Sequence, residues 1–94
     1  MVILPVTKIT VEVVDILGSG KCSMGQEVGD KYNYPDDRGK MCPSAFHILY
    51  PWLLVMQSGG EFSFFNDEGN SVELGCADHK HQVVFKITRE YVDE

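Results

Sequence analysis

The chain is 94 residues long, and 44 % of its residues are hydrophobic while 23 % are charged. A chain of this length folds as one domain with a modest core, and its composition lies far from the low hydrophobicity and high charge of disordered proteins. The formal net charge of −6 argues against nucleic-acid binding and against anionic membrane surfaces, because both depend on clustered Lys and Arg. We therefore expect a single domain, residues 1–94, with no nucleic-acid and no membrane partner.

Three features of the sequence indicate the compartment. Met1–Pro5 has no basic residue and only four apolar residues before the proline, so we expect no secretory signal. The longest apolar run, Ile48–Met56, has nine residues and contains Pro51, which is too short to cross a bilayer. The cysteine count is three, and an odd number is unusual in a small secreted domain held together by disulfides. These features together predict a cytoplasmic protein with reduced thiols.

Alternating apolar and polar residues predict two strands, one near each end of the chain. Ile9, Val11 and Val13 alternate with polar residues between Thr7 and Ile16. The same period recurs over 82–91. Weaker strand candidates lie at 28–34, 61–65 and 71–76. The turn-forming stretches are 35–39 and 66–70.

One helix is predicted, over 43–58. Pro43 suits the first helical position and places Cys42 at or beside the N-cap, while Gly59 and Gly60 provide a stop. Pro51 should bend the helix or make it restart as two short pieces. Apolar residues spaced by three and four form a face that should pack on the sheet: Ala45, Phe46, Leu49, Trp52, Leu53 and Met56. The expected fold is α+β, with a mostly antiparallel sheet of four or five strands and one kinked helix on one face.

A glycine-rich segment, residues 18–23, follows the first strand and suggests a phosphate-binding loop. The match fails because a P-loop requires glycine where Asp15 stands and Ser or Thr where Cys22 stands. A dinucleotide-binding loop would require a further glycine in place of Ser23. We therefore interpret the segment as a glycine-rich turn.

The cysteines are the residues most suited to chemistry, since each stands beside or next but one to a glycine or proline. Zinc and iron bind deprotonated sulfur and neutral imidazole, usually with a close Cys-x-x-Cys pair that this chain lacks. If folding gathers Cys22, Cys42 and Cys76, they would form a three-thiolate soft-metal site. His79 is spaced from Cys76 like a short chelate and could complete it. Alternative fourth ligands are His81 and Asp78.

Two further hypotheses remain open. The cysteines could be purely structural, because free cysteine often packs as a small hydrophobe; the protein would then be an interaction or homo-oligomeric module, with Trp52, Phe62 and Phe64 meeting a partner. A thiol-dependent redox role comes third, with Cys42 activated by the helix N-terminus and by nearby Lys40. Because no resolving cysteine or base can be placed from the sequence, the pattern favours a binding protein over an enzyme.

The order of these motifs resembles a family of small proteins without an assigned activity, found chiefly in anaerobic bacteria and archaea as single domains or tandem repeats. The stretches that carry the resemblance are Ile9–Val13, Gly20–Cys22, Gly25, Val28–Asp30, Gly39–Pro43, Tyr50–Trp52, Gly59–Gly60, Cys76–Asp78 and Val83–Ile87. The resemblance implies a shared role for the three cysteine positions. Ala77 departs from it, because the family is associated with proline after the last cysteine.

Overall fold

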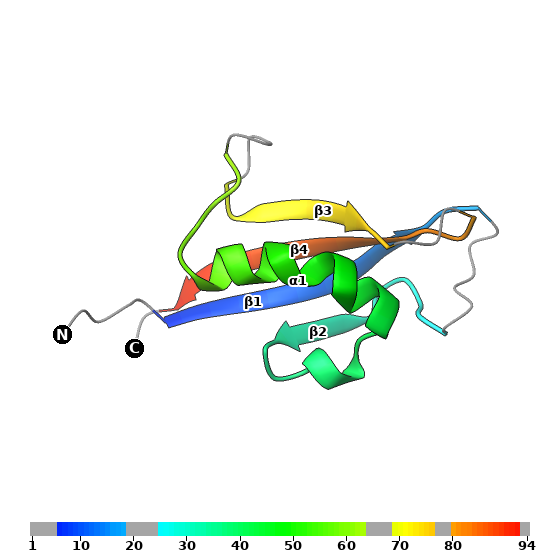
Figure 1. The fold of residues 1–94 in the computed structure, drawn as a ribbon, viewed down its shortest axis with the longest axis horizontal. Helices are drawn as coiled ribbons and strands as arrows, with labels where there is room; N and C mark the ends of the chain where they lie inside the picture. The colour runs from blue at the N-terminus through cyan, green and yellow to red at the C-terminus, as the bar shows by residue number, and fades with distance from the viewer. Residues whose placement is uncertain (1–5, 19–24, 64–68, 77–79, 93–94) are drawn as a thin grey trace.

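The structure is a computed structural model that describes residues 6–18, 25–63, 69–76 and 80–92. Its elements are β1 (Val6–Ile16), β2 (Lys31–Tyr34), the short 3-10 helix η1 (Arg38–Lys40), α1 (Pro43–Gln57), β3 (Ser71–Gly75) and β4 (Val83–Val92). The four strands form one antiparallel sheet in the order β2-β1-β4-β3. α1 lies across one face of this sheet (Figure 1), which confirms the predicted α+β fold.

The two strands predicted from alternation are the long central pair. β1 and β4 pair from Val6 opposite Val92 to Ile16 opposite Val83, with an irregularity between Val13 and Asp15. Since successive residues of a strand point to opposite faces, every second side chain of each strand reaches the α1 side. The buried hydrophobic residues of that face in β1 and β4 are Ile9, Val11, Val13, Ile16, Val83, Phe85 and Ile87.

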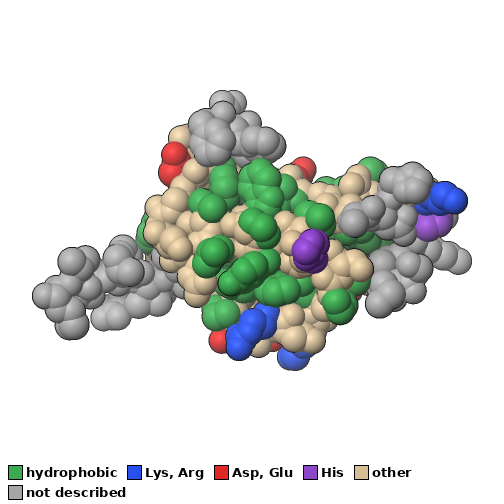
Figure 2. All heavy atoms as spheres, viewed as in Figure 1, with side chains coloured by type: hydrophobic (Ala, Val, Ile, Leu, Met, Phe, Trp, Pro, Cys, Tyr) green, Lys and Arg blue, Asp and Glu red, His purple; other side chains and the backbone are tan. Residues whose placement is uncertain are grey.

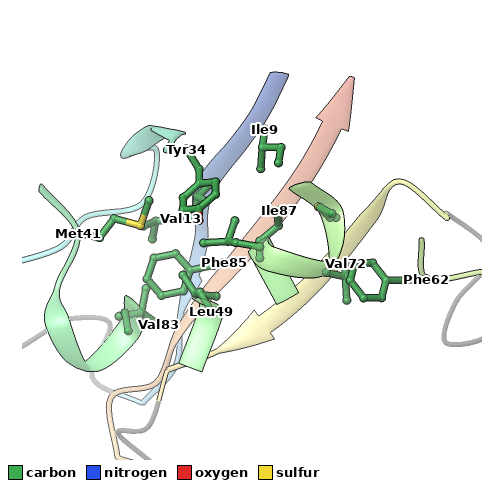
Figure 3. Packing of buried hydrophobic residues seen from close by; sticks show 14 of the residues in the cluster. Ile9, Val13, Tyr34, Met41, Leu49, Phe62, Val72, Val83, Phe85 and Ile87 are labelled. Atoms are coloured by element: carbon green, nitrogen blue, oxygen red, sulfur yellow. The ribbon is translucent and has the colours of Figure 1, made fainter. Parts of the chain in front are cut away.

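α1 covers these residues with the face that its spacing predicts. Ala45, Leu49, Leu53 and Met56 are buried, and Phe46 and Trp52 pack against the edges of the same cluster. Figure 3 shows Leu49 beside Phe85 and Val83. Burying a Leu or Phe side chain contributes about 1.5–3 kcal/mol, so this layer of contacts holds the helix on the sheet.

Pro51 does not divide the helix. α1 runs without a break from Pro43 to Gln57, so the alternative of two short pieces is wrong, while the bend stays a prediction. Proline removes the hydrogen bond to the residue four positions earlier, here His47. Both Pro51 and His47 are exposed, and water can satisfy the freed carbonyl on the outer side of a helix.

The fifth predicted strand, at 61–65, is not seen in its described part. Glu61–Ser63 are outside any strand, while Phe64 and Phe65 lie outside the described residues. The Glu61 carboxylate accepts hydrogen bonds from the Ser63 backbone N–H at 2.8 Å and the Ser63 hydroxyl at 2.6 Å. Such local bonds compete with strand pairing, and Phe62 instead packs on Trp52 with ring centroids 5.2 Å apart.

A buried arginine fastens the C-terminal end of α1. Arg89 is 3 % exposed, and its Nη1 donates to the carbonyl oxygens of Met56 at 2.8 Å and Gly60 at 2.5 Å. Its Nε donates to Asn70 Oδ1 at 3.1 Å. One side chain of β4 therefore connects the last turn of α1, the segment that follows it and the residue before β3.

The face of the sheet away from α1 is polar and its side chains form rows across the strands. One row alternates in charge from strand to strand, in the order Lys31, Glu12, Lys86 and Glu73. The neighbouring row is uncharged, in the order Asn33, Thr10, Thr88 and Ser71. Opposite charges and hydroxyls on adjacent strands stabilise a sheet by about 0.2–1 kcal/mol per pair, so these rows support the register. Their members are exposed or half-buried, except for Ser71, which is buried.

Candidate metal centre

Cys76 is placed by the antiparallel pairing of β3 with β4. It follows Gly75, and its N–H donates to the Val83 carbonyl at 2.9 Å, which extends the pairing by one residue. Leu74 pairs with Phe85, and side chains two residues apart share a face. The Cys76 side chain therefore lies on the α1 side of the sheet, where it packs, half-buried, against the core.

The sulfur of Cys76 accepts a hydrogen bond. The Val83 N–H donates to Cys76 Sγ at 3.2 Å. Backbone donors of this kind tune metal–thiolate centres. The Gln82 amide crosses the hairpin to donate to the Cys76 carbonyl at 2.9 Å, and it passes so close to Gly75 that an added Cβ would collide with it. Two neighbours thus fix the position of this cysteine.

Cys42 occupies the predicted N-cap of α1. Its carbonyl accepts from the Phe46 N–H at 2.8 Å, and its side chain makes no capping hydrogen bond. Met41, immediately before it, is 5 % exposed. Its buried side chain holds the segment that leads into α1 against the core. The sulfur is half-buried at the positive end of the helix dipole, which favours a negatively charged group.

Both cysteines belong to the same end of the fold. Figure 1 shows the start of α1, the end of β3, the start of β4 and the end of β1 at one end of the sheet. Cys42 and Cys76 pack against the same core cluster, and both are free thiols. The fold therefore brings two of the three predicted sulfur ligands to a common face and a common end.

The other two predicted ligands, Cys22 and His79, lie outside the described residues, as does the alternative Asp78. The described segment that ends before Cys22, at Gly18, contacts the described segment that begins after His79, at Lys80. Leu17 N–H donates to the Gln82 carbonyl at 2.9 Å, and Gly18, at φ +75°, abuts the Lys80 carbonyl so closely that a Cβ would not fit. The segment leading to Cys22 is thus attached to the segment that follows His79.

Within ranges 6–18, 25–63, 69–76 and 80–92, no group of three or more His, Cys, Asp or Glu side chains is arranged to hold a metal ion. Cys42 and Cys76 can supply two ligands, and a complete tetrahedral set requires others. The four-residue site remains a prediction.

Lysine 40 does not favour the redox hypothesis. Lys40 Nζ lies 3.3 Å from Asp37 Oδ1, so its charge is shared with a carboxylate. The Asn33 N–H donates to the Asp37 carboxylate and, with the added effect of Lys40, lowers the pKa of Asp37 against a smaller opposing effect of desolvation. Lys40 is therefore part of the turn that leads into α1.

Two further groups, Glu61 and Tyr34, have shifted pKa values. Hydrogen bonds from the Ser63 hydroxyl and N–H lower the pKa of Glu61, with a smaller contribution from Arg89. Burial, followed by the nearby Tyr50, raises the pKa of Tyr34, whose hydroxyl donates to Gln57 Oε1 at 3.3 Å. Of these two groups, Tyr34 bonds directly to the last residue of α1.

Arg89 is the buried charged residue that the sequence pattern did not lead us to single out. It continues the alternation of Val83, Phe85 and Ile87, so the sequence placed it on the buried side of the strand.

A separate open hollow of about 350 Å³ is lined by Gly69, Asn70, Ser71, Lys86 and Thr88. Neither described cysteine lines this hollow, which is therefore distinct from the metal candidate.

Comparison with protein-family models, with curated proteins and with solved structures finds no match for this chain. None of the helices in the described part of the chain is long and apolar enough to cross a membrane.

Proposed function

We propose that the protein binds one soft metal ion, zinc or iron, through Cys22, Cys42, Cys76 and His79. The observation that carries this proposal is the position of Cys42 and Cys76, which come from distant parts of the sequence and share one face at one end of the sheet. Two thiolates are half of a tetrahedral soft-metal site. The contact between Gly18 and Lys80 supports convergence of the remaining two ligands on the same end.

The surroundings of the two sulfurs suit metal-bound thiolates. The Val83 N–H directed at the Cys76 sulfur and the helix N-terminus at Cys42 both stabilise negative charge. Both cysteines are half-buried residues, so neither is enclosed in the core. A bound ion would tie the start of α1 to the end of β3, and metal-binding energy of this kind adds directly to folding stability.

The proposal also covers the biological setting. The metal would be structural or would be passed to a partner, in a cytoplasm where thiols stay reduced. Membership of the family of small anaerobe proteins that the chain resembles would fit a role of this kind, because the three cysteines belong to the shared pattern. We do not propose a catalytic activity.

Metal analysis of protein purified without oxygen tests the proposal. We expect about one zinc or iron ion per chain, and cobalt(II) added to the metal-free protein should give a thiolate-to-metal absorption band. Cys42→Ser and Cys76→Ser should each remove the band or weaken cobalt binding at least about tenfold. His47→Ala is the matched control, because His47 is an exposed histidine of α1, and this variant should bind as the wild type does.

A different result would overturn the proposal. Less than about one soft metal per three chains, with all three thiols freely titratable in the folded protein, would leave the cysteines as structural residues. Equal cobalt binding by the wild type and both cysteine variants would have the same consequence, since the thiols would then not be ligands.

A further inference from the structure

α1 carries no charged residue, although it is a surface helix of an acidic protein. The chain has eight Lys and Arg and fourteen Asp and Glu, and none of them falls among the fifteen residues of α1. Surface helices normally place charged residues on the side away from the core. The outer side of α1 is therefore unusual, and ordinary solvent exposure does not account for it.

Apolar side chains gather on this outer side. Tyr50 and Leu54 are 44 % exposed and Val55 is 41 % exposed, and Pro51 and His47 lie between them on the same side of the helix. We call these five residues the outer stripe. Figure 2 shows hydrophobic side chains spread over the face of the molecule that α1 covers. Contiguous apolar patches of this kind mark interaction sites more often than isolated exposed residues do.

We infer that the outer stripe is a self-association surface, and that its occupant is α1 of a second copy of this chain. Two copies with a net charge of −6 each repel one another. In a twofold dimer each surface patch meets the same patch of the other copy. A charged patch would therefore face charges of its own sign, whereas the outer stripe would face an uncharged surface. The uncharged helix is thus the surface at which two acidic copies can approach closely.

The charge of the molecule also argues against a lipid surface as the occupant. Helices that lie on membranes carry Lys and Arg on their polar side, and these residues bind anionic headgroups. α1 has neither, and the opposite side of the helix is committed to the core through Leu49 and Leu53. A second copy requires no such basic residues.

The size of the surface sets the expected strength. A fifteen-residue helix is about 22 Å long and about 10 Å wide, so one face provides roughly 220 Å². Stable dimers bury about 600 Å² or more per copy. Contact must therefore extend to the half-buried rings of Phe46 and Trp52 beside the stripe, and the dimer belongs to the weak class.

Phe62, suggested from the sequence as a contact residue, is 3 % exposed and cannot take part, while Phe64 lies outside the described residues.

Sedimentation of the full chain, in chelator so that metal cannot bridge two copies, tests the inference. The wild type should be monomeric near about 1 µM and should approach the dimer mass near about 1 mM. Leu54→Glu places a carboxylate on the stripe and should weaken association at least about tenfold. Val28→Glu adds the same charge at a residue that is 61 % exposed and outside α1, so this variant should associate as the wild type does.

Circular dichroism and urea unfolding establish that each variant is folded before its mass is measured. A wild type that stays monomeric to about 1 mM overturns the inference, as does Leu54→Glu that associates like Val28→Glu. Binding to phosphatidylcholine or phosphatidylserine vesicles without self-association would assign the stripe to lipid and would overturn it as well. Each of these results leaves the metal proposal unaffected, because self-association is measured in chelator, without bound metal.

Discussion

The two ends of α1 are attached to the sheet by different chemistry. At the C-terminal end, Arg89 is buried and its hydrogen bonds go to the chain itself, namely to Met56, Gly60 and Asn70. At the N-terminal end lie two half-buried cysteines, Cys42 and Cys76, whose thiols are free. A side chain whose donors are satisfied within the fold acts structurally, whereas thiols at a surface end can still accept a ligand. The comparison therefore separates a stabilising end from a binding end.

Arg89→Met gives the largest expected effect and breaks the stabilising end. The substitution keeps much of the apolar volume but removes the Arg89 donor from both carbonyls, so that Met56 keeps only the Gly59 N–H at 3.2 Å. Unpaired buried polar groups cost about 1–3 kcal/mol each, so the free energy of unfolding should fall by about 3 kcal/mol. Urea unfolding followed by circular dichroism measures this change.

The control for this substitution is Arg38→Met. Arg38 is an exposed arginine that donates to the Pro35 carbonyl at 2.8 Å, and surface changes usually stay within about 0.5 kcal/mol. If the two variants lose the same amount of stability, the structural role assigned to Arg89 is wrong.

Gly18→Ala perturbs the binding end, where the start of α1 and the end of β3 lie. Gly18 has φ +75° and lies against the Lys80 carbonyl, so alanine would be strained and would push the two segments apart. We expect a loss of about 2 kcal/mol in unfolding free energy. Weaker cobalt binding should accompany it if the segments carrying Cys22 and His79 must meet.

Gly25→Ala is the matched control for this change. Gly25 also has a positive φ, +85°, but an added Cβ there meets nothing within 4 Å. It should cost about 1 kcal/mol, from backbone strain alone, and should leave cobalt binding unchanged. A Gly18 variant that behaves like the Gly25 variant would show that the contact with Lys80 does not hold this end together.

The sequence predicts the parts of this comparison that depend on local periodicity. Alternation identified β1 and β4, and the three-and-four spacing identified the buried face of α1. It did not identify Arg89 as buried, because a charged residue in an apolar phase is usually a strand end; only the acceptors at Met56, Gly60 and Asn70 make its burial favourable. These partners come from the last turn of α1, the segment after it and the turn before β3.

The candidate site depended on tertiary information in a similar way. The sequence indicated Cys42 at the N-cap, since Pro43 follows it, and this position is confirmed. That Cys76 shares its face follows from the pairing of Leu74 with Phe85, and pairing register cannot be derived from β3 alone because its signal is five residues long. Strand order, β2-β1-β4-β3, decides which loops are neighbours.

The smallest expected effect concerns the acid titration of two carboxylates, the half-buried Asp37 and the exposed Glu61. Asp37 precedes the helix and Glu61 follows it, and the pKa of each is lowered in the folded protein, from 3.8 for Asp37 and from 4.5 for Glu61. A folded-state pKa below the unfolded value stabilises the protein at pH above the unfolded pKa, and this contribution is lost as pH falls through the folded pKa. Stability should therefore decline below about pH 4.5 through these two groups.

Asp37→Asn and Glu61→Gln should each reduce that decline, and their effects should be additive. Each amide keeps an oxygen that can accept the backbone N–H of Asn33 or Ser63, but it does not titrate. The two carboxylates share no hydrogen-bond partner among the described residues, and independent sites add within about 0.5 kcal/mol. The urea midpoint at pH 7 and pH 3 for both single variants and the double variant measures this. A double variant that differs from the sum would show that the two attachments of α1 are coupled, and the separation of a stabilising end from a binding end would then have to be replaced by one cooperative unit.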